Sequence, residues 1–298
     1  MTVFSFMGGT GASWESVLTP KERIGGPSPM GNSKWGDFRS CPHLYWWKHV
    51  KRMKLDEPED ALEIGGLYHE LRARYYQFYL DYEHELSREE LDRGCVDTAR
   101  ELLERTDKVV PYTSSEARRL FDSWLAAYGP GMPLDDREST YDVENLLEVS
   151  SPFPYSARLD RWIMTEYGPV IMEIKTAGRR DGKLINSYKL DPQFIGQVWL
   201  WRKTMSRKYG KLLSFVVDLT TKTNPVGVTR EGVSIPDAVI RRWEQDMRYW
   251  HMLRIQCETT NTWPKNYGYR CRFCSALDHC ATNGKNNAGW IKKKRGDY

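Results

Sequence analysis

Apolar residues recur every three or four positions through the first half of the chain, which is the spacing of an amphipathic α-helix. The pattern covers residues 59–80, 87–106 and 114–128. The second and third stretches also begin with Ser or Glu, which favour the first turn of a helix. We therefore expect the first half of the chain to be mainly helical.

The pattern changes to alternation at Tyr141, after which β-branched and aromatic residues become frequent. Turn residues divide the stretch 141–177 into three parts, which predicts three antiparallel strands. Asp191 as N-cap and Pro192 at the first helical position then mark the start of a helix. Two further strands and a long helix follow, at residues 211–222, 225–234 and 235–258.

This order predicts an α/β fold, with a mixed central sheet flanked by helices and a helical addition on its N-terminal side. Glycine, serine and proline are abundant in residues 1–33, which predicts a flexible arm, and residues 283–298 form a basic tail. Between them we expect one domain, residues 34–282. Its predicted parts are a mainly helical part (34–140), a catalytic α/β core (141–258) and a cysteine segment (259–282).

Composition narrows the class of protein only a little. The 298 residues carry a formal net charge of +4 and a pI near 8.6, which fits a nucleic-acid-binding protein without requiring one. No apolar run is long enough to span a bilayer, and the N-terminus does not resemble a signal peptide. We therefore expect a cytoplasmic protein with no membrane partner. A phosphate-binding loop is also absent, which excludes a built-in ATPase of that type.

One pair of strands carries candidate catalytic chemistry. Glu173 and Lys175 lie two residues apart, so they point to the same face of their strand, and a turn brings the strand of Asp160 beside them. Two converging carboxylates can bind a hard divalent ion such as Mg²⁺ or Mn²⁺, and a lysine can orient water or stabilise negative charge. A surface ion pair would explain a bare Glu-x-Lys equally well. Here the flanking residues are apolar, and a buried ion pair is costly.

The cysteines suggest a second, softer metal centre. Cys271, Cys274 and Cys280 lie within ten residues, and a centre of this kind usually needs a fourth ligand. Cys41, Cys95 and Cys257 are the candidates. Cys95 and Cys257 fall in helical stretches with apolar neighbours, which is typical of buried thiols. Four thiolates suit an iron–sulfur cluster or zinc, and His279, beside Cys280, keeps zinc open.

The order of these motifs resembles the PD-(D/E)XK nuclease superfamily, in its RecB-like branch. The chain has Gly66-Leu67-Tyr68-His69, then Ala157-Arg158-Leu159-Asp160, then Glu173-Ile174-Lys175-Thr176, then Gln197-Val198-Trp199-Leu200-Trp201. Ala157 replaces the usual glycine and Trp201 the usual tyrosine. Gln193 is a competing candidate for the glutamine.

The resemblance implies a role for each motif residue. The metal ligands would be His69, Asp160, Glu173 and the backbone carbonyl of Ile174. Lys175 would position the attacking water, and Gln197 would contact Lys175 or the DNA strand. The implied activity is a Mg²⁺- or Mn²⁺-dependent deoxyribonuclease, an exonuclease in most relatives.

The cysteines extend the resemblance to a subset that carries a [4Fe–4S] cluster. This subset includes AddB-type recombination nucleases and the exonucleases of CRISPR spacer acquisition. Its pattern of one early cysteine and a late group of three is met by Cys41, Cys271, Cys274 and Cys280. The cluster would join the N- and C-terminal segments as a clasp.

The resemblance also bears on partners and pathway. It implies DNA that is single-stranded or has free ends, and a separately encoded helicase or recombination protein as a possible partner. The setting would be replication, recombination, repair or CRISPR-type processing in a bacterial or phage-infected cell, and phage encoding would fit this setting. The alternative is a non-catalytic DNA-binding or scaffold protein that keeps the fold and the cluster.

Overall fold

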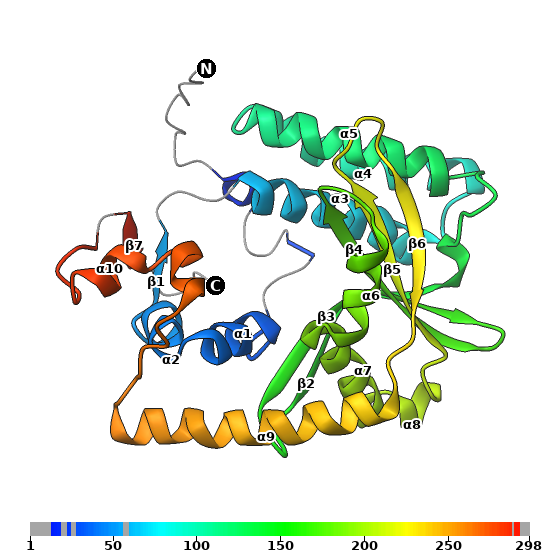
Figure 1. Ribbon diagram of the computed structural model, residues 1–298. Helices are drawn as coiled ribbons and strands as arrows, with labels where there is room; N and C mark the ends of the chain where they lie inside the picture. The colour runs from blue at the N-terminus through cyan, green and yellow to red at the C-terminus, as the bar shows by residue number, and fades with distance from the viewer. Residues whose placement is uncertain (1–12, 19–22, 25–27, 56–59, 288, 293–298) are drawn as a thin grey trace.

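The computed structural model of the chain describes residues 13–18, 23–24, 28–55, 60–287 and 289–292 (Figure 1). Its α-helices are α1 (Asn32–Ser40), α2 (Pro42–Tyr45), α3 (Asp60–Tyr82), α4 (Arg88–Asp107), α5 (Pro111–Tyr128), α6 (Gly182–Ser187), α7 (Pro192–Thr204), α8 (Ser206–Tyr209), α9 (Asp237–Thr260) and α10 (Leu277–Ala281). Short helical segments of other types are η1 (Trp14–Val17), η2 (Trp46–Val50), η3 (Arg137–Ser139), η4 (Tyr188–Leu190) and η5 (Tyr269–Phe273). The strands are β1 (Met53–Leu55), β2 (Thr140–Val149), β3 (Tyr155–Thr165), β4 (Gly168–Ala177), β5 (Ser214–Thr221), β6 (Val228–Val233) and β7 (Trp290–Lys292).

Five strands form the central sheet, in the order β2–β3–β4–β5–β6. The first three make an antiparallel meander, β4 pairs with β5 in parallel, and β5 pairs with β6 antiparallel. A parallel pair needs a long crossover, which α6, α7 and α8 provide. The predicted α/β fold with a mixed sheet flanked by helices is therefore confirmed.

Helices cover both faces of this sheet (Figure 1). Helices α3, α4 and α5 lie on one face, where their buried side chains form one hydrophobic cluster with Val143 and Ile174. Helices α7 and α9 lie on the other face and share a second cluster with α1. The two segments predicted as a mainly helical part and an α/β core are thus packed together through the sheet.

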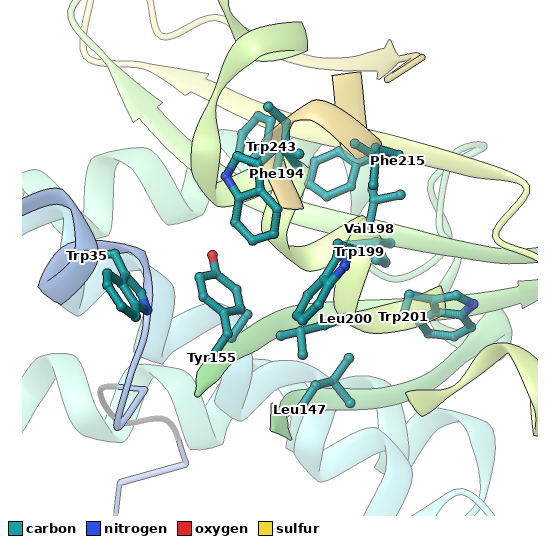
Figure 2. Close-up of a cluster of buried hydrophobic side chains, with 14 of the residues drawn as sticks. Trp35, Leu147, Tyr155, Phe194, Val198, Trp199, Leu200, Trp201, Phe215 and Trp243 are labelled. Carbon is teal, nitrogen blue, oxygen red and sulfur yellow. The ribbon is translucent and has the colours of Figure 1, made fainter. Parts of the chain in front are cut away.

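Helix α7 packs closely on β3 because its contact position is a glycine. A Cβ added to Gly196 would lie 2.0 Å from the hydroxyl oxygen of Tyr155, so no larger residue fits there. Figure 2 shows Tyr155 among Phe194, Trp199 and Trp243 in this core. Trp201, which stands where the family motif has tyrosine, is buried and donates a hydrogen bond from Nε1 to the Gly210 carbonyl oxygen at 3.1 Å.

A second, smaller sheet joins a segment of the first quarter of the chain to a segment near its C-terminus. Its strands β1 and β7 pair antiparallel, with Lys54 opposite Ile291. Within the predicted arm, Trp14 and Leu18 are buried in the hydrophobic cluster of α3, α4 and α5. The domain limits drawn from the sequence remain predictions, and most of the predicted arm and the last part of the basic tail, residues 293–298, lie outside the described residues.

Buried charges tie α3 to β5. Arg72 Nη2 donates to Asp218 Oδ2 at 2.7 Å, and both side chains are buried. Arg230 Nε also donates to this oxygen, at 3.3 Å. Since Arg72 lies one helical turn after His69, this ion pair holds the part of α3 that carries the histidine. Within the described part of the chain, no helix is long and apolar enough to cross a lipid bilayer.

Replacing Asp218 by asparagine keeps the side-chain volume but removes the counter-charge of buried Arg72. We expect Asp218→Asn to lower the free energy of unfolding by about 3–5 kcal/mol, because this is the typical cost of breaking a buried ion pair. Urea unfolding followed by circular dichroism measures the change.

The exposed pair of Arg93 and Glu89, whose charged atoms lie 3.0 Å apart, provides the control. Glu89→Gln should change the free energy of unfolding by less than about 1 kcal/mol, because water screens exposed pairs. Similar small changes in both variants would contradict the structural importance of the Arg72–Asp218 pair.

Candidate active site

The hydrogen-bonded ladder between β3 and β4 ends at the pair Arg161–Met172. Beyond this pair, the backbone N–H of Ile174 donates to Asp160 Oδ2 at 2.7 Å instead of to a β3 carbonyl. A strand residue directs its N–H and its carbonyl to the same side, so the Ile174 carbonyl also faces this opening. The divergence of the two strands therefore creates a polar gap in the sheet.

Glu173 and Lys175 lie on β4 beside this gap. Lys175 Nζ is 2.7 Å from Glu173 Oε1, and the Glu173 side chain is only 1% exposed. The i, i+2 spacing on one strand brings these side chains to one face, as the sequence predicts. The alternative of a surface ion pair does not describe this arrangement, because Glu173 is buried.

Two glutamines on α7 hold Glu173 from the other side. Gln197 Nε2 donates to Glu173 Oε2 at 2.7 Å, and Gln193 Nε2 donates to Glu173 Oε1. Gln193 Oε1 also accepts from Lys175 Nζ at 3.1 Å. The contact with lysine that we expected of Gln197 is therefore made by Gln193. The two glutamines act together because they are one helical turn apart and share a face.

His69 reaches the gap from α3, on the opposite side. Its Nδ1 lies 3.6 Å from Asp160 Oδ2. The hairpin of β3 and β4 and two helices that are distant from it in sequence, α3 and α7, thus meet at Asp160 and Glu173. All the side chains predicted from the sequence for this site are brought together.

The carboxylates differ in their electrostatic surroundings. Burial would raise the pKa of Asp160, but the nearby charges of His69 and Lys175 and the Ile174 N–H outweigh it and lower this pKa. Burial and the negative charge of Asp160 raise the pKa of Glu173. Burial would lower the pKa of Lys175, but Glu173 and Asp160 raise it, so the lysine is held as a cation. Shifted carboxylates beside a fixed cation are typical of functional sites.

A third carboxylate, Glu144 of β2, was not singled out from the sequence. Its φ of 48° is unusual for a residue other than glycine, and Arg158 Nη1 donates to its carbonyl oxygen at 2.7 Å. Burial and then the charge of Asp160 raise the pKa of Glu144. A lone glutamate in an alternating strand gives no sequence signal for this position.

The donor atoms at the gap fit a hard divalent cation. They are the carboxylate oxygens of Asp160 and Glu173, the Ile174 carbonyl oxygen and a nitrogen of His69, which suit Mg²⁺ or Mn²⁺. Across the described ranges, however, no three His, Cys, Asp or Glu side chains are grouped closely enough to hold a metal ion. Both oxygens of Glu173 accept hydrogen bonds, from Lys175 Nζ and Gln197 Nε2.

The cysteines gather at a separate place. Cys41, Cys271, Cys274 and Cys280 all line one pocket of about 370 Å³ between α2 and the C-terminal segment, and all are free thiols. Cys95 and Cys257 are instead buried in the two hydrophobic clusters, as expected. The sulfur atoms line the walls of the pocket without converging on one point. The donor set of four thiols in one pocket fits a soft metal centre.

His279 does not join the thiols around this pocket. It is buried against Trp47, with the two ring centres 3.6 Å apart, and its Nδ1 contacts Asn287 Oδ1 at 2.8 Å. The ring of His43 stacks on it from another side, with a centroid distance of 5.5 Å. These contacts make His279 a packing residue of the C-terminal segment.

Comparisons with known proteins give one strong result and two weak ones. The solved structures that resemble the chain include a protein of Eubacterium rectale described as a "Putative exonuclease", with a TM-score of 0.49, 15% identity and coverage of 89% of this chain and 90% of that chain. Another is SSO0001, with a TM-score of 0.30, 14% identity and coverage of 74% of this chain and 85% of that chain. A search of curated proteins finds no match.

The strong result comes from the comparison with protein families. The match spans residues 32–281, which include both strands of the polar gap, α3, α7 and the four cysteines of the pocket. It therefore covers most of the chain and both candidate sites. On this evidence the chain belongs to the PD-(D/E)XK nuclease superfamily.

Proposed function

We propose that this nuclease hydrolyses the phosphodiester bonds of DNA with a bound Mg²⁺ or Mn²⁺ ion, and that it acts as an exonuclease. The observation that carries the proposal is the polar gap between β3 and β4, where Asp160, Glu173 and Lys175 meet. Burying the Glu173 carboxylate beside the half-buried Asp160 and Lys175, at an interrupted ladder, has a high cost in stability. A catalytic role explains why the chain would bear this cost.

Each residue has a distinct task in the proposed reaction. His69, Asp160, Glu173 and the Ile174 carbonyl would hold the divalent ion, which when bound would activate a water and neutralise charge on the phosphate. Lys175 directs its ammonium group toward the same point and orients the attacking water.

The two glutamines hold the side chains of Glu173 and Lys175 in position. Gln193 contacts both Lys175 and Glu173, so it fixes the position of the lysine relative to the carboxylate. Gln197 holds the second oxygen of Glu173 and also donates to the Arg158 carbonyl oxygen at 3.1 Å, which joins α7 to β3. Both are positioning residues in this proposal, since they act through Glu173 and Lys175.

The finer parts of the proposal rest on the motifs. The order His69, Asp160, Glu173-Ile174-Lys175 and a glutamine helix supports the RecB-like branch, and with it DNA substrates that are single-stranded or have free ends. The same resemblance supports work beside a separately encoded helicase or recombination protein, in a bacterial or phage-infected cell. The mildly basic charge of the chain is consistent with a DNA substrate.

We further propose a [4Fe–4S] cluster held by Cys41, Cys271, Cys274 and Cys280. Support comes from the pocket that all four thiols line, although Cys41 is far from the others in sequence. The backbone N–H of Asn266 lies 3.5 Å from Cys41 Sγ, so the two segments already touch. The cluster would stabilise this junction, because a ligand bridge closes a very long loop of chain.

The active-site assignment predicts the effect of three substitutions. Asp160→Ala, Glu173→Ala and Lys175→Ala should each lower the cleavage rate at least about 100-fold, because each removes metal charge or water positioning. End-labelled DNA with Mn²⁺ measures cleavage, and a binding assay in Ca²⁺ should give dissociation constants close to that of the wild type.

Glu166→Ala is the matched control, since Glu166 is an exposed carboxylate at the turn between the same two strands. It should cleave at the wild-type rate. A protein that binds DNA but never cleaves it, in any divalent ion, would favour the non-catalytic scaffold instead.

The exonuclease assignment predicts a need for a free end. With Mg²⁺ or Mn²⁺, linear single-stranded DNA should be degraded while a closed circle of the same sequence persists. Calcium or excess chelator should stop the reaction, because Ca²⁺ prefers looser geometry and activates water poorly. Rapid nicking of the circle would indicate an endonuclease.

The clasp predicts that Cys41→Ser loses most of the iron and sulfide that the wild-type protein carries after anaerobic purification. The thermal midpoint should fall as well, because the link between the two ends is lost. Cys257→Ser, which changes a thiol of the hydrophobic core, should keep the iron and the sulfide. Zinc in place of iron and sulfide in the wild type would identify the rival metal.

A further inference from the structure

Large aromatic side chains are concentrated on the surface beside the cysteine pocket. Among the exposed large apolar residues that the structure describes, four aromatic side chains exceed 70% exposure. Three of them, Tyr267 (77%), Tyr269 (73%) and Phe273 (71%), lie within seven residues of each other. The fourth, Tyr167 (75%), is at the distant turn between β3 and β4. Such a concentration on the surface indicates a contact site.

Arginines lie between these rings. The Arg272 guanidinium is 5.9 Å from the ring centre of Tyr269 and 5.5 Å from that of Phe273, and these two rings meet edge to face at 5.6 Å. Lys265, Arg270 and Arg272 are the charged residues between Trp263 and Cys274, so the stretch is positive. Alternating rings and cations fit a partner that has both flat apolar faces and negative charge. We call Tyr267, Tyr269, Arg272 and Phe273 the aromatic platform.

The backbone that carries the aromatic platform is anchored to α1. Asn266 Nδ2 donates to the Ser40 carbonyl oxygen at 2.9 Å, and Arg270 Nη1 donates to Ser40 Oγ at 3.2 Å. The rings therefore stand on a fixed support, which reduces the entropy lost on binding.

The same helix connects the platform with the active site. Helix α1 packs in the same hydrophobic cluster as α7, the helix that carries Gln193 and Gln197. Asp191 is the N-cap of α7, where its carboxylate accepts from the Gln193 N–H at 2.8 Å.

We propose that the aromatic platform binds the unpaired bases of single-stranded DNA by stacking. Bases supply the flat faces and phosphates supply the charge that Arg270 and Arg272 complement, and stacking does not depend on base identity. Duplex DNA would not fit, because its bases already stack on one another. This inference rests on the proposed nuclease function. It specifies single-stranded DNA as the substrate of that function.

Stacking can be separated from charge by comparing two strands with the same phosphates. Oligothymidylate and an abasic oligomer of equal length, both fluorescently labelled, are titrated with the full-length protein in Ca²⁺, and anisotropy reports binding. We expect wild-type protein to bind oligothymidylate at least about tenfold more tightly, because one stacked base contributes about 1–3 kcal/mol. Equal affinities would overturn the proposal, and this comparison needs no variant.

Variants locate the effect on the aromatic platform. Tyr267→Ala/Tyr269→Ala/Phe273→Ala should bind oligothymidylate no more tightly than the abasic oligomer, with the abasic affinity changed by less than about threefold. Tyr267→Phe/Tyr269→Phe, which keeps the rings, should retain the wild-type preference. Tyr167→Ala removes an equally exposed ring at the distant turn and should also retain it. A triple variant that keeps the preference, whether or not it loses iron, would overturn the proposal.

Cleavage of oligothymidylate in Mn²⁺ tests the nuclease function independently. Wild-type protein that prefers oligothymidylate but never cleaves it would sustain the platform and refute the nuclease proposal. Wild-type protein that cleaves oligothymidylate but binds it no more tightly than the abasic strand would refute the platform and sustain the nuclease proposal.

Discussion

The hydrogen bond from the Ile174 N–H to the Asp160 carboxylate is the interaction on which the arrangement of the site depends. A buried backbone N–H must find an acceptor, and in a regular sheet a carbonyl of the next strand provides it. Here the part of β3 that precedes Arg161 is not paired with β4, and the Asp160 side chain accepts the Ile174 N–H at 2.7 Å. This substitution lets the sheet open without leaving the Ile174 N–H unpaired. The gap is therefore a stable feature of the fold and also the place where the polar side chains meet.

The helices on the two faces of the sheet supply the remaining groups of the site. Helix α7 brings two glutamines to Glu173, and it can approach β3 because Gly196 leaves room for Tyr155. Helix α3 brings His69, and the buried pair of Arg72 and Asp218 holds that helix to β5. Packing on both faces thus determines the distances between side chains that no single element could set by itself.

The C-terminal segment, with the cysteine pocket and the aromatic platform, is held at the side of this core. The side chains of Asn266 and Arg270 in this segment donate hydrogen bonds to Ser40 at the end of α1, and α1 in turn packs in the same hydrophobic cluster as α7. The cysteine pocket and the aromatic platform are therefore attached to the helix that carries the glutamines.

The sequence by itself determined the order of elements and the main candidates for chemistry. Helical spacing and strand alternation are local properties, so the helices α3 to α5, the meander and the cap of α7 at Asp191 could all be predicted from neighbouring residues. The motif around Asp160, Glu173 and Lys175 is also compact in sequence. Only the tertiary structure decided which glutamine contacts the lysine, that Glu144 lies near Asp160, and that Arg72 pairs with Asp218. These contacts join residues on different elements, and their partners depend on how strands diverge and helices pack, which local sequence patterns do not encode.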